Sequence, residues 1–142
     1  MLRLNKDVIF LKMKNLAQYL GELEPLVSVG IVEYQKDYVK RHAVEKLVEL
    51  IVEIASDINR DIIEAEQSEP ATSYFSTFTQ LGELKILSKE LSVRLASTTG
   101  LRNRLVHHYE DIEHKIVYHS AGKMLKDYRQ YFQLIEKYLQ AH

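Results

Sequence analysis

The segment VEKLVELIVEIASDINRDIIEA, residues 44–65, decides the fold class. Its apolar residues recur every three or four positions, which is the spacing that places them on one face of an α-helix. A long helix with one apolar face has to bury that face against other elements, so the segment predicts a helical bundle. We expect this helix to run from about Asp37 to Ala65. The residues expected to face inward are Val44, Leu47, Val48, Ile51, Ile54, Ala55, Ile58 and Ile62.

Similar spacing on either side of this segment predicts further helices. No stretch alternates with period two for long enough to indicate a strand. Residues 26–37 fit either a short helix or a turn, and residues 82–87 read as a turn. The chain is therefore expected to be all-α, an antiparallel bundle of about five helices. The other expected helices are 5–24, with Asn5 as N-cap and Pro25 as its stop, 71–81, with Pro70 in its first turn, one that begins at the N-cap Ser88 and has an apolar stripe from Leu91 to Leu105, and 113–140.

Composition narrows the class of protein. The chain has 142 residues, 46% of them hydrophobic, with five glycines and two prolines, which favours one helical domain spanning residues 1–142. The absence of cysteine excludes disulfides and cysteine nucleophiles and fits a reducing cytoplasm. Neither a signal-peptide pattern nor an 18-residue apolar run is present, so we expect no membrane association and a cytoplasmic location. A net charge of −1 argues against non-specific coating of nucleic acid.

The segment RNRLVHHY, residues 102–109, gathers most of the side chains that could perform chemistry. On a helix, Asn103 and His107 are four residues apart and share one face. Arg102 and Tyr109 are seven apart and also align, about 100–160° around the axis from the first pair. If the helix ended near His108, Tyr109 would be released from it. Because the two pairs diverge, we expect a working site to form in a cleft between two copies of the chain.

These residue types fit metal-independent cleavage of RNA. Such a reaction uses the 2′-hydroxyl as nucleophile and needs a base, an acid and positive charge on the phosphorane oxygens. Histidine can serve as acid or base, and arginine presents a planar fork of donors to a phosphate. An amide such as Asn103 can orient the histidine or hold a phosphate oxygen. The alternative is that the segment is a solvated helix end whose histidines act only as caps.

Other polar residues invite weaker hypotheses. His107, His108, His114 and His119 lack the spacing of a metal site, so no metal and no other cofactor is expected. His108 is expected to face solvent or to support the site from behind. Asp57 and Asn59 lie on or beside the apolar stripe of the second long helix. They are either polar residues serving the cleft or a satisfied polar pair.

The pattern R-x-x-x-x-H-x-Y formed by Arg102, His107 and Tyr109 resembles the motif of HepT-like toxins in the HEPN superfamily. Asn103 directly after the arginine is typical of that motif, and a Gly-Leu pair precedes it here. The Asp57-Ile58-Asn59 stretch, the overall length and the late position of the motif are also similar. The resemblance therefore extends over essentially the whole chain.

The resemblance implies a HEPN-like helical fold and a toxin that works as a metal-independent endoribonuclease on tRNA or mRNA. It implies a homodimer with the motif in the interface cleft, and Arg102 and His107 as the catalytic pair. It further implies neutralisation by a cognate MNT nucleotidyltransferase antitoxin that transfers AMP to Tyr109. A bulky negative group there would repel RNA from an arginine meant for phosphate. The competing hypothesis is a non-catalytic scaffold or nucleotide-binding partner of a nucleotidyltransferase.

Overall fold

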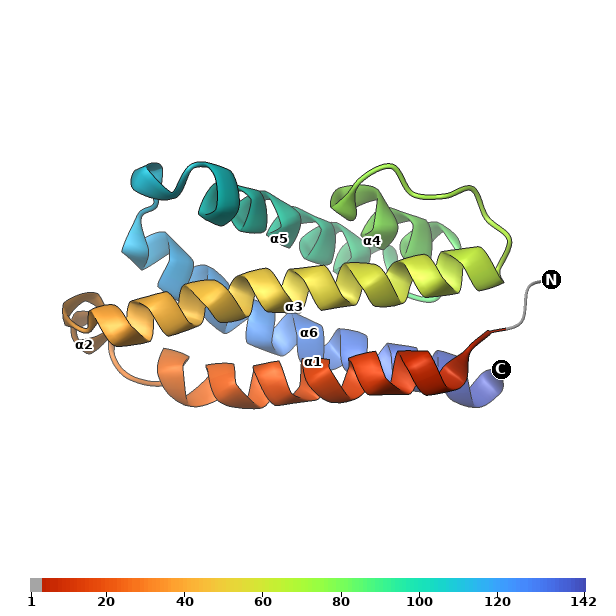
Figure 1. The fold of residues 1–142 in the computed structure, drawn as a ribbon, viewed down its shortest axis with the longest axis horizontal. Helices are drawn as coiled ribbons and strands as arrows, with labels where there is room; N and C mark the ends of the chain where they lie inside the picture. Colours follow the sequence, from red (N-terminus) through yellow and green to blue (C-terminus); the bar gives the residue numbers. More distant parts are fainter. Residues whose placement is uncertain (1–3) are drawn as a thin grey trace.

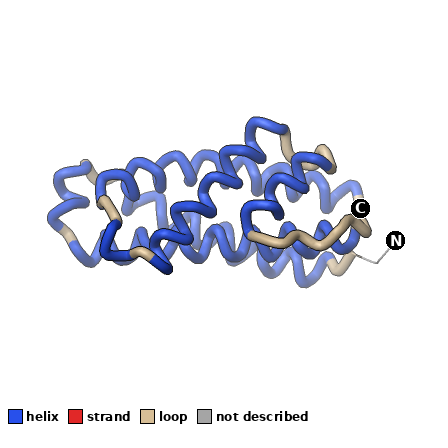
Figure 2. Tube along the Cα trace, turned by 90° about the horizontal axis from the view of Figure 1, so that it is seen from above, coloured by secondary structure: helices blue, strands red, loops and turns tan. Residues whose placement is uncertain are grey.

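The computed structural model describes residues 4–142, and this part of the chain is helical with no β-strand (Figures 1 and 2). It holds six α-helices and one 3-10 turn. The one helix beyond the five expected is the short α2, which lies in residues 26–37, where the sequence fitted either a helix or a turn. Their bounds are α1 Lys6–Val27, α2 Ile31–Lys36, α3 Tyr38–Ala65, α4 Tyr74–Glu83, α5 Lys89–His107, η1 Tyr109–Asp111 and α6 His114–Ala141.

Successive long helices run in opposite directions, so that α1 and α5 point one way, α3 and α6 point the other, and together they form an elongated bundle (Figure 1). In Figure 1, α1 and α6 lie along one side of α3, while α4 and α5 lie along the other. The connection from α5 through η1 to α6 sits at the same end as α2 and the start of α3. The N- and C-terminal ends of the described chain lie at the opposite end. The chain order thus brings the end of the motif helix close to the beginning of α3.

Side-chain caps define where several helices begin. Asn5 Oδ1 accepts a hydrogen bond from the Val8 backbone N–H at 3.3 Å, as expected for an N-cap. Asp37 Oδ1 accepts from the N–H groups of Val39 and Lys40 at 3.1 and 3.2 Å. Ser88 caps α5 by accepting from Leu91 N–H at 3.2 Å. The predicted starts of these three helices agree with the structure because short polar side chains satisfy backbone donors there.

The two prolines behave differently from the prediction. Pro25 was expected to stop the first helix, but α1 continues through it to Val27. Leu26 and Val27 pack against the core, which favours one more turn despite the missing proline N–H. Pro70 was expected in the first turn of the next helix, but it lies in the loop between α3 and α4 that Figure 2 draws in tan. That helix starts later because Ser73 forms a capping box with Ser76.

A single hydrophobic core connects all six α-helices. Most residues predicted to face inward on α3 are fully buried, and Ile54 is partly buried. Helix α4 packs tightly on α5, where Gly82 lies directly against Ser92. Among residues 4–142 no helix is long and apolar enough to cross a membrane.

Candidate active site

Arg102 extends from α5 toward α3 and α4 rather than into solvent. Its Nε and Nη2 atoms donate hydrogen bonds to Glu53 Oε2 at 3.1 and 2.9 Å. Its guanidinium carbon lies 4.7 Å from the centre of the Tyr74 ring, a distance that allows a cation–π contact. The side chain is 16% exposed. Contacts from two neighbouring helices therefore fix the orientation of the guanidinium while part of it remains accessible.

Asn103 contacts Arg102 and not His107. Its Oδ1 accepts a hydrogen bond from Arg102 Nη1 at 3.2 Å. Together with Glu53, this bond occupies three of the five N–H donors of the guanidinium. The expected hydrogen bond from Asn103 to His107 is not formed in this structure. The structure instead places Asn103 beside the arginine as an additional anchor.

His107 is exposed in the last turn of α5. Within residues 4–142 its ring makes no hydrogen bond or ion pair, so both ring nitrogens remain available to another molecule. His108 follows as the C-cap, is exposed, and donates its backbone N–H to Arg104 O at 2.8 Å. His108 therefore faces solvent, one of the two environments expected for it.

Tyr109 lies outside the motif helix, because α5 ends at His107. The tyrosine begins η1, and its phenol donates a 2.8 Å hydrogen bond to Glu45 Oε1 on α3. His42 Nδ1 lies 3.2 Å from the same phenolic oxygen. Burial first, and then the hydrogen bond to Glu45, raises the pKa of the Tyr109 phenol above its ordinary 10.0. The ring itself is 42% exposed.

Asp57 and Asn59 do not join this group. Asp57 is exposed and pairs only loosely with Arg60, at 3.8 Å. Asn59 is fully buried, accepts a 2.6 Å hydrogen bond from Tyr131 and donates a 3.1 Å bond to Thr77 Oγ1. Neither residue contacts Arg102, His107 or Tyr109 in this structure, so a role in the cleft stays a prediction. Asn59 is a satisfied core amide, and Asp57 is a surface residue, because the two point to different sides of α3.

The prediction missed the two acidic residues that hold the motif, Glu53 and Glu45. A signal for Glu45 is present in the sequence. It falls on the same seven-residue row of α3 as the buried Val52 and Asn59, so the pattern places an acid at an inward position. Glu53 is partly exposed and falls on no buried row. Its pairing with Arg102 depends on how α3 packs against α5, which the sequence does not reveal.

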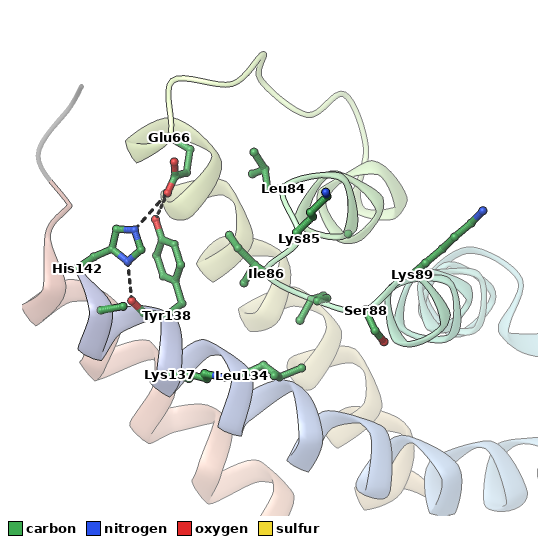
Figure 3. Close-up of a pocket in the computed structure, with 13 residues that line it drawn as sticks. Glu66, Leu84, Lys85, Ile86, Ser88, Lys89, Leu134, Lys137, Tyr138 and His142 are labelled. Atoms are coloured by element: carbon green, nitrogen blue, oxygen red, sulfur yellow. Dashed lines mark hydrogen bonds and ion pairs between the residues drawn. The ribbon is translucent and has the colours of Figure 1, made fainter.

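A pocket of about 790 Å³ lies at the far end of the bundle from the motif (Figure 3). There the Tyr138 phenol hydrogen-bonds to Glu66 Oε1 at 2.5 Å, and His142 stacks on the Tyr138 ring. The lining of this pocket contains no residue of the 102–109 segment. Within the described chain, no set of three His, Asp or Glu side chains is arranged to hold a metal ion. The motif therefore remains the strongest candidate for chemistry.

A helical bundle that presents an arginine and a histidine five residues apart on one helix, followed by a tyrosine, is the arrangement expected from the resemblance to HepT-like proteins. Comparisons with known proteins agree. The family model described as "Ribonuclease HepT-like" matches residues 16–135. The chain therefore belongs to the HepT-like ribonuclease family. This confirms the class of protein, the all-α fold and the ribonuclease assignment that the sequence predicted.

Individual relatives cover nearly the full chain. A protein of Aphanizomenon flos-aquae named "tRNA nuclease HepT" is 31% identical over 132 residues, covering 93% of this chain and 90% of that protein. The "mRNA nuclease HepT" of Shewanella oneidensis is 25% identical over 130 residues, covering 92% and 97%. A solved structure of the tri-AMPylated Shewanella oneidensis HEPN toxin in complex with MNT antitoxin has a TM-score of 0.85 at 24% identity, covering 92% of this chain and 98% of that one.

Proposed function

We propose that Arg102 and His107 together cleave RNA without a metal ion. Arg102 binds the scissile phosphate through its remaining N–H donors, and its positive charge stabilises the phosphorane oxygens. His107 transfers the proton of the attacking 2′-hydroxyl or of the leaving 5′-oxygen. The observation that carries this proposal is the contrast between the two side chains. The guanidinium is held in place by Glu53 and Tyr74, whereas the imidazole is exposed and uncommitted.

The working site is proposed to need two copies of the chain. Five residues along an α-helix turn the side-chain direction by about 500°, so Arg102 and His107 point about 140° apart. A second copy facing this end of α5 would supply the complementary residue to each cleft. Val106 and Ile116 support such a contact, because these apolar side chains are 40% and 43% exposed beside the motif.

The RNA substrate is proposed to be tRNA or mRNA, the classes named for the two curated relatives. On the described surface, a groove of about 700 Å³ lies between α5, the helix that carries the motif, and α6. Arg94, Arg104 and Lys123 line it and could hold the phosphate backbone. Because the net charge of the chain is −1, RNA binding would have to rely on a local basic patch of this kind. The protein is proposed to work in the prokaryotic cytoplasm, where both classes of RNA are present.

Regulation is proposed to come from an MNT nucleotidyltransferase antitoxin that transfers AMP to Tyr109. The related Shewanella oneidensis toxin is described as tri-AMPylated and in complex with its MNT antitoxin. Tyr109 is the tyrosine of the motif, two residues after His107, and the residue is 42% exposed. Each added phosphate brings a negative charge to the site where RNA phosphate would bind, so the modified protein would lose its substrate.

The catalytic assignment is tested with His107→Ala. We expect the purified variant to lose RNA cleavage and the cell to tolerate its expression, while the helical fold is preserved. His119→Ala is the matched control, because His119 is also exposed but lies along α6. Cleavage by His107→Ala at the wild-type rate would contradict the proposal. Wild-type protein that neither cleaves RNA nor slows growth without the antitoxin would support the non-catalytic scaffold instead.

The two-chain site has its own test. Arg102→Ala and His107→Ala proteins are each expected to be inactive, but a mixed dimer would contain one cleft with both residues intact. Mixing the variants after partial denaturation and refolding should therefore restore cleavage. If Arg102 and His107 of the same chain worked together, the mixture would stay inactive.

A further inference from the structure

Glu45 is the only charged residue among those buried in residues 4–142, with 5% of its side chain exposed. It lies in the second turn of α3 and faces η1 and the start of α6. Its Oε1 atom accepts the 2.8 Å hydrogen bond from Tyr109. Burying a carboxylate is costly unless other groups compensate it. A residue of this kind beside the proposed modification site therefore calls for a functional explanation.

Three other groups, from α2, α3 and α6, lie close to this carboxylate or interact with it electrostatically. His42 Nδ1 lies 3.2 Å from Glu45 Oε1, and His114 Nδ1 lies 3.7 Å from Oε2. Arg41 acts on Tyr109 through its positive charge, and Glu45 in turn raises the pKa of the buried Tyr34 phenol after the larger effect of burial. The cluster therefore places one buried carboxylate beside two imidazoles that can pass on a proton, while among the described residues its Oε2 atom has no hydrogen-bond partner.

The Tyr109 phenol needs such a neighbour in order to react. A phenol attacks phosphorus far better as it loses its proton, yet this one holds its proton more firmly than an ordinary tyrosine. Glu45 Oε1 already accepts the hydrogen bond of this phenol, so it is in position to accept the proton. His42 is the other candidate, but 59% of its side chain is exposed and its contact is longer.

We propose that Glu45 is the proton acceptor for nucleotidyl transfer to Tyr109, an inference that rests on the modification proposed above. Tyr109 Oη attacks the α-phosphorus of a nucleoside triphosphate, and the new bond forms between Oη and that phosphorus. The bond from the α-phosphorus to the bridging oxygen breaks, and pyrophosphate leaves with the electron pair. The phenolic proton moves to Glu45 Oε1 and from there to His42, which opens to solvent.

The test measures AMP incorporation at different pH values. Wild-type protein and Glu45→Gln are incubated with the antitoxin, ATP and Mg²⁺, and the intact mass is followed over time. The glutamine can still accept the hydrogen bond but cannot take the proton. We expect its rate at neutral pH to fall about 100-fold or more, the usual scale of general base catalysis. Its rate should then rise about tenfold per pH unit as phenolate forms, so that the deficit shrinks toward pH 9.

Glu66→Gln is the matched control, because Glu66 accepts a similar hydrogen bond from Tyr138 at the far end of the bundle. This variant should incorporate AMP like the wild type. Glu45→Asp keeps the base on a shorter side chain and should recover part of the rate. Thermal unfolding of each variant establishes that it is folded under the assay conditions.

Three outcomes would overturn the inference. Glu45→Gln could react as fast as the wild type, or its deficit could stay constant at all pH values, which would indicate a structural defect. Alternatively, His42→Gln could show the large, pH-dependent deficit in its place. Wild-type protein that gains no AMP on Tyr109 would be a different result, because it removes the proposed modification itself.

Discussion

Glu53 holds Arg102 through a single oxygen, since Oε2 accepts both the Nε and the Nη2 hydrogen bonds. Two donors that converge on one acceptor fix the guanidinium in its plane and leave the other edge for a ligand. The acid therefore acts on the proposed reaction only through the arginine. This arrangement also explains why a partly exposed glutamate on α3 contributes to a site carried by α5.

Removing this anchor should impair catalysis more than binding. In Glu53→Ala the guanidinium keeps its charge but loses its fixed orientation. We expect kcat for RNA cleavage to fall by up to about 100-fold, with a smaller change in KM, because misplacement by about 1 Å can have that effect. Glu49→Ala, one turn away on α3, should cleave like the wild type. A Glu53→Ala protein with unchanged kcat would show that Arg102 needs no intrachain anchor.

The polar core at Asn59 is expected to matter for stability and not for cleavage. Asn59→Ala removes one hydrogen-bond partner each from the Tyr131 hydroxyl and Thr77 Oγ1, which keep their bonds to Ala55 O and Tyr74 O. We expect the free energy of unfolding to fall by about 1–3 kcal/mol, on top of the lost packing. Asp57→Ala, at an exposed position of the same helix, should change it by less than about 0.5 kcal/mol. Urea denaturation measures both.

Cleavage assays well below the unfolding temperature complete that comparison. Both variants should cut RNA at the wild-type rate, since neither residue contacts Arg102, His107 or Tyr109. A selective loss of cleavage in Asp57→Ala would support the hypothesis that Asp57 serves the cleft.

Glu45 and Glu53 on α3 show which parts of the site can be predicted from sequence. Spacing alone predicted the bundle and the helix that carries the motif, because apolar periodicity depends only on neighbours along the chain. It also indicated that Arg102 and His107 diverge. It did not identify Glu53, because that contact depends on how two helices pack. Tyr109 was expected either in line with Arg102 on the helix or released from it, and the end of α5 at His107 decided for release.

The N-cap of α3 predicts a specific response to acid. Asp37 accepts hydrogen bonds from two backbone N–H groups and pairs with Lys40 at 3.1 Å, and these contacts lower the pKa of its carboxyl below the ordinary 3.8. A lowered pKa in the folded state means that the stabilisation is present above pH 3.8. It is lost as the pH falls from there through the folded-state pKa.

The comparison with Asp37→Asn isolates this charge, because asparagine can still cap the helix. The wild type should be the more stable protein at pH 6, and the difference should close as the pH falls below 3.8. Chemical denaturation in steps from pH 6 to pH 3 measures the difference. If the difference in unfolding free energy between the two proteins were the same at pH 6 and pH 3, the carboxylate charge would contribute nothing to stability.

Gly82 and Gly21 should respond in opposite ways to the same substitution. A Cβ at Gly82 would come within 2.5 Å of Ser92 Oγ and 2.8 Å of Ser92 Cβ, whereas one at Gly21 would meet nothing within 4 Å. Ser92 is buried, and its hydroxyl is bonded to Lys89 O at 2.8 Å, so it cannot turn away freely. Gly82→Ala should therefore destabilise the protein by about 1–3 kcal/mol. Gly21→Ala, on an exposed part of α1, should stabilise it by about 1 kcal/mol.

A double-mutant cycle assigns the Gly82 effect to this one contact. In a Ser92→Gly background both clashing atoms are gone, so adding Gly82→Ala should become neutral or stabilising. Thermal unfolding is a suitable measurement, since 1 kcal/mol shifts Tm by about 2–4 °C in a chain of this size. If Gly82→Ala were equally harmful with and without Ser92, the close approach of α4 to α5 would not be the cause.

The orientation of Tyr74 against Arg102 depends on that same packing, so a loss of stability at Gly82 should be accompanied by slower RNA cleavage.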